Sequence, residues 1–276
     1  MSAAGPLDAR GSGDRWSFGA GSGEFRKPLD ILVTATTSGL DVDLKGHGAL
    51  NEDETKRLVR LALRQNLARL SNHGAIVTLQ RPTFVAMGRA MVALPPGAFL
   101  QATEAGEAAL AARVRNALAG AHRIADLFAG VGTLSLRLAE FARVQAFDFE
   151  EPALEALAKA SHVEGLRPVS VETRDLFRRP LGPAELAVFD AVVFDPPRAG
   201  AEQQARALAG SVVPLVVAVS CNVQTFARDA AILCAGGYEL AQVEPIDQFR
   251  HSPHVEIIAI FKRPLMKPQR RRRILS

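Results

Sequence analysis

The spacing of apolar and polar positions changes near residue 105 of this 276-residue chain. Beyond that point, short apolar runs alternate with helical stretches such as residues 105–119 and 134–141, which is typical of βαβ units in a mainly parallel sheet. Two later apolar runs, at residues 238–243 and 254–261, are too close together for a crossover helix and predict an antiparallel hairpin that closes the sheet. The expected parallel strands span residues 124–128, 144–148, 169–172, 191–194 and 213–219. The predicted fold class is α/β with a doubly wound sheet.

A smaller α+β region is expected before this sheet, at residues 29–95. Residues 29–35 and 40–44 alternate like two half-buried strands, and the polar stretch between them predicts a hairpin. Residues 52–70 carry leucines along one face of a predicted helix. The other face is basic and can contact phosphate groups, or it can simply be solvated, which is more common for such charges. Its basic residues are Lys56, Arg57, Arg60 and Arg64.

The two ends of the chain differ in composition from the rest. Residues 1–28 are rich in Gly, Ser and Ala and predict a flexible arm. Residues 265–276 form a basic tail with four consecutive arginines. The net charge of +4 is mild, so this tail can bind a polyanion or be only a solvated end.

Composition narrows the classes of function. Two cysteines, Cys221 and Cys234, are too few for a disulfide framework, an all-cysteine zinc site or an iron–sulfur cluster, so we expect no metal. No apolar run approaches the roughly 20 residues of a membrane span, and the first residues lack a signal-peptide pattern. We therefore expect a cytoplasmic, monomeric protein with no membrane partner.

A glycine-containing loop at residues 126–135 lies between a predicted strand and a helix, where doubly wound folds bind nucleotides. Gly130 and Gly132 let a ligand approach the backbone, although the G-x-G-x-x-G fingerprint of dinucleotide-binding proteins is incomplete. Asp148 and Asp175 follow the next two strands, in places suited to ribose hydroxyls and an adenine amino group. Each acid alone is more often a turn residue or a helix cap. Together the three features favour a ligand that contains adenosine.

Three other strand ends carry groups suited to covalent chemistry. Cys221 ends an apolar strand and precedes a helix predicted to begin near Thr225, so the helix N-terminus is expected to make its thiol a better thiolate. Asp195 follows another strand, in a loop fixed by two prolines. Glu256 shares a strand face with apolar residues, and burial would raise its pKa to suit proton transfer. Each residue also has a purely structural explanation: a buried hydrophobic thiol for Cys221, a rigid turn for Asp195 and a solvated strand end for Glu256.

These motifs occur in the order found in one known family. Phe99-Leu-Gln101, the glycine-containing loop, Asp195-Pro-Pro-Arg-Ala-Gly, Ser-Cys221-Asn and His-Val-Glu256 resemble S-adenosylmethionine-dependent RNA 5-methyluridine (uracil-C5) methyltransferases, over about residues 95–263. The resemblance implies a Rossmann-like methyltransferase domain at residues 96–264 and RNA, either rRNA or tRNA, as the partner. It also implies that Cys221 attacks C6 of uracil, that C5 takes the methyl group, and that Glu256 removes the C5 proton.

The residue patterns and the resemblance together assign the remaining site residues. The methyl donor, S-adenosyl-L-methionine, is expected to contact Gln101, Asp126, Phe128, Gly130, Gly132, Asp148, Asp175 and Asp195. The base is expected to contact Asp195, Pro196, Arg198, Asn222 and His254.

The sequence departs from the family pattern at Thr103, where the family has asparagine, and at Arg250 and Ser252, where it has proline and threonine. Many members also have an oligonucleotide-binding barrel and iron–sulfur cysteines that this sequence lacks. Either RNA is recognised by residues 29–95, by the basic tail or by another protein, or the chain is a shortened homologue. The alternatives are RNA cytosine-C5 methylation, a catalytically silent homologue that binds S-adenosylmethionine and RNA, and a small-molecule methyltransferase.

Overall fold

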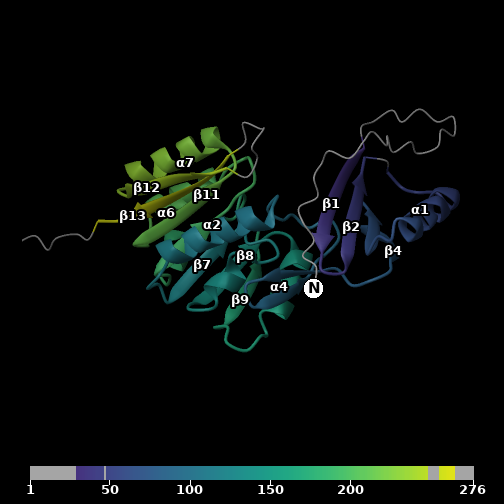
Figure 1. Cartoon of the computed structure of the whole chain (residues 1–276). Helices are drawn as coiled ribbons and strands as arrows, with labels where there is room; N and C mark the ends of the chain where they lie inside the picture. Colours follow the sequence, from purple (N-terminus) through teal and green to yellow (C-terminus); the bar gives the residue numbers. More distant parts are fainter. Residues whose placement is uncertain (1–28, 47, 248–254, 265–276) are drawn as a thin grey trace, which may run out of the picture.

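The computed structural model describes residues 29–46, 48–247 and 255–264, which form three β-sheets (Figure 1). The arm expected at residues 1–28, the basic tail at 265–276 and the three positions Arg250, Ser252 and His254 lie outside the described residues. In the described part of the chain, no helix combines the length and the apolar character needed to cross a membrane.

The large sheet confirms the predicted doubly wound fold. Its order is β12-β13-β11-β10-β7-β8-β9; pairing is parallel from β11 to β9, whereas β13 is antiparallel to both β11 and β12. The chain runs from β7 outward to β8 and β9, and then returns to β10 on the other side of β7. The strand order therefore reverses between β7 and β10, and doubly wound sheets bind ligands in the crevice outside the carboxyl ends of the strands at such a point. The strands are β7 (Arg123–Leu127), β8 (Arg143–Asp148), β9 (Val169–Thr173), β10 (Ala191–Phe194), β11 (Leu215–Ser220), β12 (Glu239–Ile246) and β13 (Glu256–Lys262).

Helices cover both faces of this sheet, so its strands are apolar on both sides. In β10, Val192 and Phe194 pack into the core on one face, whereas Ala191 and Val193 pack into the core on the other. The first face carries α5 (Pro183–Leu186), α6 (Glu202–Ala209) and α7 (Val223–Ala235). The second face carries α2 (Glu104–Ala117), α3 (Ser135–Leu138), α4 (Glu151–Ala160) and the hairpin of β5 (Phe84–Met87) and β6 (Ala90–Ala93).

A four-stranded sheet and α1 stand beside the large sheet (Figure 1). The predicted hairpin is confirmed, because β1 and β2 pair antiparallel across a turn between Thr36 and Gly39. The prediction of a helix over residues 52–70 is wrong beyond Arg64. Asn66 has a positive φ of 52°, which breaks the helix, and Leu70 lies in β3 beside Val42. The elements are β1 (Asp30–Thr36), β2 (Gly39–Lys45), α1 (Glu52–Arg64), β3 (Arg69–Asn72) and β4 (Ala75–Leu79).

A buried ion pair connects the small sheet to the segment that leads into α2. Arg69 on β3 and Asp41 on β2 are 4% and 5% exposed, and the guanidinium donates two hydrogen bonds of 2.8 and 2.5 Å to the carboxylate. The same guanidinium donates to the carbonyl oxygen of Leu94 at 2.7 Å. Nearby, Gly97 lies so close to Asp43 that a Cβ atom at Gly97 would be 2.8 Å from Oδ2. These contacts hold the turn that follows β6.

We expect Arg69→Met to lower the free energy of unfolding by about 3–5 kcal/mol, because it leaves the Asp41 carboxylate buried without its cation. The double variant Asp41→Leu/Arg69→Met removes both charges and should recover most of the loss. Urea unfolding followed by circular dichroism measures both. An equal loss in the single and double variants would show that the charge pairing is not what stabilises this contact.

Candidate active site

The loop after β7 brings backbone, rather than side chains, to the crevice. Phe128 has a positive φ of 61°, which is unusual for an aromatic residue, and Gly130 and Gly132 have φ of 53° and 94°. A Cβ atom at Gly132 would lie 2.3 Å from Cδ1 of Leu157, so this glycine is needed for close packing against α4. A Cβ atom at Gly130 would meet nothing within 4 Å, so the loop is open on that side.

Two predicted carboxylates hold this loop in place. Asp148, at the end of β8, accepts hydrogen bonds from the amides of Gly130 and Glu150, each at 2.9 Å. Asp126 on β7 is 1% exposed and accepts a 2.6 Å hydrogen bond from the hydroxyl of Ser135. Burial raises the pKa of Asp126 to about 7; the Ser135 hydrogen bond opposes this shift and the charge of Asp148 adds to it.

Asp175 follows β9 and is partly exposed. Its Oδ1 accepts the amide hydrogens of Phe177 at 3.0 Å and Arg178 at 3.2 Å, which closes a turn. This turn places the Phe177 ring 5.4 Å from the ring of Phe128, centroid to centroid. The glycine-containing loop and the loop after β9 therefore meet through an aromatic pair that sequence reasoning did not identify.

Asp195, directly after β10, is half-buried at the crevice. Its Oδ2 accepts a 3.2 Å hydrogen bond from Nε2 of Gln101, so the segment before α2 reaches across to β10. Burial, then the negative charges of Glu256 and Asp126, raise the pKa of Asp195 to about 7, against the effect of the Gln101 hydrogen bond. Thr103, the departure from the family pattern, caps α2 by accepting the amide hydrogen of Gly106 at 3.0 Å.

Cys221 follows β11 and is half-buried. Burial and the charges of Glu256 and Asp195 raise the pKa of its thiol above the ordinary value, and the positive charge of Arg198 opposes this without reversing it. The expectation of a better thiolate at the helix N-terminus is therefore wrong. Burial and the two neighbouring carboxylates disfavour the thiolate more than the positive charge of Arg198 favours it, so the thiol is neutral at pH 7 in the free protein.

Glu256 opens β13, which pairs antiparallel with β11 so that Ile257 lies opposite Ser220. The register brings Glu256 beside Cys221 although the two residues lie far apart in the sequence. Burial raises the pKa of Glu256, as expected, and the charge of Arg198 opposes the shift. Its Oε2 is buried without a hydrogen-bond partner among the described residues, which is costly for a carboxylate oxygen.

Asn222 and α7 fix the geometry around the thiol. The Asn222 side chain caps α7 by accepting the amide hydrogens of Gln224 at 2.9 Å and Thr225 at 3.3 Å, so its oxygen is already engaged. Farther along α7, Asp229 accepts the amide hydrogen of Ala201 at 2.6 Å and ties the loop after Asp195 to this helix. Asp229 was missed by sequence reasoning because it carries no local motif and lies far along the chain from its partner.

The two remaining described positions, Pro196 and Arg198, differ in exposure. Pro196 is buried in the loop after β10, whereas Arg198 is exposed and acts on Cys221 and Glu256 through its charge. The structure therefore brings Asp195, Cys221, Arg198 and Glu256 to one place and sets the glycine-containing loop and Gln101 against them. Among the described residues, no group of three or more His, Cys, Asp or Glu side chains could hold a metal ion.

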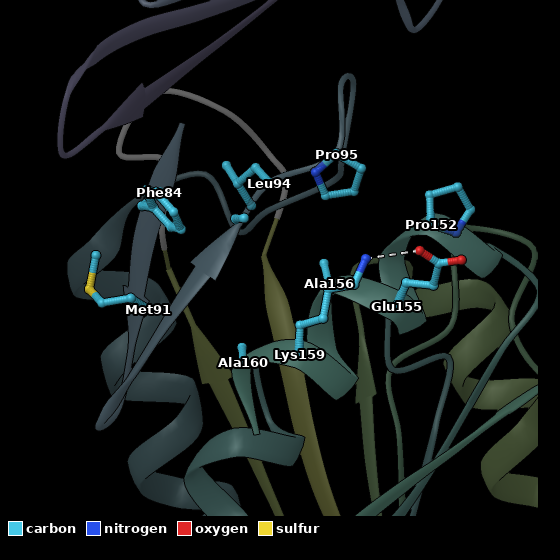
Figure 2. A pocket seen from close by; sticks show the side chains of 10 residues that line it. Phe84, Met91, Leu94, Pro95, Pro152, Glu155, Ala156, Lys159 and Ala160 are labelled. Atoms are coloured by element: carbon cyan, nitrogen blue, oxygen red, sulfur yellow. Dashed lines mark hydrogen bonds and ion pairs between the residues drawn. The ribbon is translucent and has the colours of Figure 1, made fainter. Parts of the chain in front are cut away.

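A separate groove of about 440 Å³ lies between the β5–β6 hairpin and α4 (Figure 2). Its lining is mainly apolar, with Phe84 and Met91 on the hairpin, and its charged groups, Glu155 and Lys159, pair with each other at 3.1 Å (Figure 2). This groove carries no group suited to catalysis.

The chain is similar in sequence to bacterial RNA methyltransferases. It is 50% identical over 241 residues to an uncharacterized RNA methyltransferase from Brucella suis, covering 87% of this chain and 57% of that protein. It is 39% identical over 174 residues to the 23S rRNA (uracil(1939)-C(5))-methyltransferase RlmD from Chromohalobacter salexigens, covering 61% of this chain and 35% of that protein. The chain thus spans a little over half the length of the first of these relatives. No family model matches the chain.

The fold is shared with a solved structure, the Pyrococcus abyssi tRNA (uracil-54, C5)-methyltransferase in complex with S-adenosyl-L-homocysteine. The TM-score is 0.67 at 24% identity, over 84% of this chain and 59% of that one. The motif order, the sheet order and these relatives together support the RNA uracil-C5 methyltransferase family as the one that this chain resembles.

Proposed function

We propose that this protein transfers a methyl group from S-adenosyl-L-methionine to C5 of a uridine in rRNA or tRNA. The observation that carries the proposal is the Cys221 thiol at the end of β11, placed with the Asp195 and Glu256 carboxylates at the ligand-binding crevice. A thiol in this setting suits addition to a pyrimidine ring better than metal binding or redox chemistry.

The residues around the crevice fit the proposed donor. The open side of Gly130 leaves room for a ligand at the backbone, and Asp148 lies beside it with lone pairs for ribose hydroxyls. Asp126 and Asp195 add negative potential, which favours a sulfonium cation. When bound, the donor supplies an electrophilic methyl group.

The protein's own groups would then handle bonds and protons. The Cys221 sulfur adds to C6 of uracil, and its proton passes to a neighbouring carboxylate, which the raised pKa of Asp195 allows. The new S–C6 bond makes C5 a carbon nucleophile that would take the methyl group, while the bond between the methyl carbon and the donor sulfur breaks and leaves S-adenosyl-L-homocysteine. Glu256 removes the C5 proton, the C5–C6 double bond re-forms and the S–C6 bond breaks. A carboxylate with a raised pKa is a stronger base and suits this step.

The direct test is nucleoside mass spectrometry of unmodified RNA after incubation with the protein and isotope-labelled S-adenosylmethionine. We expect labelled 5-methyluridine from the wild type and from Cys234→Ala, whose thiol is exposed on α7. Cys221→Ala should lose on the order of 10³-fold in rate or more, with donor affinity nearly unchanged. Labelled 5-methylcytidine would change the substrate to cytosine, and full activity in Cys221→Ala would refute the covalent step.

Glu256→Gln should trap the RNA on the protein, because the C5 proton can no longer be removed and the S–C6 bond persists. The complex should survive denaturing electrophoresis and map to Cys221 by mass spectrometry. Glu244→Gln, a control on β12, should turn over normally without a trapped complex. Normal turnover in Glu256→Gln would assign the base to another residue.

Gly132→Ala should weaken donor binding by about tenfold or more, because the added Cβ atom collides with Leu157 at a φ of 94° and displaces the loop. Gly120→Ala is the matched control, since its φ is 97° but its Cβ atom meets nothing within 4 Å. Isothermal titration with S-adenosyl-L-homocysteine measures both. Equal losses in the two variants would point to general backbone strain and not to a donor-binding loop.

A further inference from the structure

The face of the large sheet over β7, β8 and β9 is polar at its amino edge. Arg123 and Arg143 are register partners in neighbouring parallel strands, so their side chains leave the same face side by side. Two residues further along β8, Gln145 shares that face and is the register partner of Ser170 on β9. We call the hollow lined by these four side chains the β7–β9 groove; its volume is about 420 Å³.

The groove exists because the helical layer is incomplete here. Between β9 and β10 the chain forms α5, a single turn, where a doubly wound sheet usually carries a longer helix. Phe189, just after α5, closes the inner end of the groove and packs into the core below. On the neighbouring strands β8 and β9, Gln145 is partly exposed and Ser170 is exposed.

The two arginines in this groove have no acidic partner. Their guanidinium groups make no ion pair or hydrogen bond with any described residue, and Asp190, which lies close in the fold, accepts the backbone amides of His122 and Arg123 instead. Like charges placed opposite each other across strands are destabilising unless an anion joins them. Several other surface cations of this domain are paired, as in Arg113–Glu244, Arg115–Glu140, Lys159–Glu155 and Arg206–Glu202.

We propose that the β7–β9 groove binds the phosphodiester backbone of the RNA substrate, at nucleotides remote from the one that is methylated. Two adjacent guanidinium forks match phosphate oxygens, and Gln145 and Ser170 can donate further hydrogen bonds. From Arg123 to Leu127, the strand rises about 13 Å at about 3.3 Å per residue. At the rise of about 3.4 Å per phosphate of a stacked strand, this distance corresponds to about four nucleotides. The inference rests on the proposed function for the identity of the partner.

The test measures binding of the full chain to a 20-nucleotide oligouridine by fluorescence anisotropy at several salt concentrations. We expect Arg123→Glu/Arg143→Glu to weaken binding about tenfold and to reduce the slope of log K against log salt by about 1.4, which corresponds to two lost phosphate contacts. Arg123→Gln/Arg143→Gln should lose less affinity but show a similar change in slope, and it guards against misfolding of the charge-reversed variant.

The matched control is Lys159→Glu/Arg206→Glu, which changes the net charge equally on other parts of the surface. Its affinity should stay within about twofold of the wild type. Equal losses in both doubly reversed variants, or no loss in the groove variants, would overturn the proposal. If inorganic phosphate binds the wild type in a ³¹P titration while RNA affinity is unchanged in the groove variants, the groove serves a free phosphate and the RNA assignment is wrong. Donor affinity should be unaffected throughout, and because no methyl transfer is measured, the result is independent of the proposed reaction.

Discussion

The site depends on one constraint: several carboxyl groups lie close together in a crevice that is largely shielded from solvent. Asp126, Asp195 and Glu256 all have raised pKa values, chiefly through burial, and the charges of Asp195 and Glu256 also hold the Cys221 thiol in its neutral form. Among the described residues, Arg198 is the cation whose charge lowers the pKa values of both the thiol and Glu256. A bound cation would relieve this crowding and favour both the carboxylates and the thiolate. The proposed sulfonium donor would therefore do more than supply a methyl group, because its charge would also prepare the nucleophile.

The same sheet gives its two edges opposite character. At the carboxyl edge, the ends of β7, β8 and β10 present acids held by backbone amides, by Ser135 and by Gln101. At the amino edge, β7 and β8 begin with unpaired arginines. An RNA strand that contacts both edges would be held by its phosphates at one and would place a neutral base at the other. Such a separation would keep the acidic crevice free of phosphate groups.

The small sheet is joined to this site through a short, physically continuous connection. Arg69 binds Asp41 within the small sheet and the carbonyl of Leu94 beyond it. Leu94 and Ala98 pack against the same core as the glycine-containing loop, and Gln101 follows within a few residues. A buried, bidentate ion pair is a rigid link. A displacement of the small sheet would therefore be transmitted to the hydrogen bond between Gln101 and Asp195 and change its geometry.

Local patterns along the chain were sufficient to predict the parallel sheet, its closing hairpin and the order of the motifs, because period-2 alternation and apolar runs of strand length are local signals. The sequence placed Cys221 and Asp195 correctly at strand ends for the same reason. It failed over residues 65–70, where the leucine spacing suits a helix and only the positive φ of Asn66 and pairing with β2 decide the outcome. It also failed for the Cys221 thiol, since a pKa depends on charges that the fold assembles from distant strands. Three features could be recognised only in the folded chain: Glu256 lies beside Cys221, Asp229 anchors the loop after β10, and an incomplete helical layer exposes two arginines. Each depends on contacts between residues far apart in the sequence.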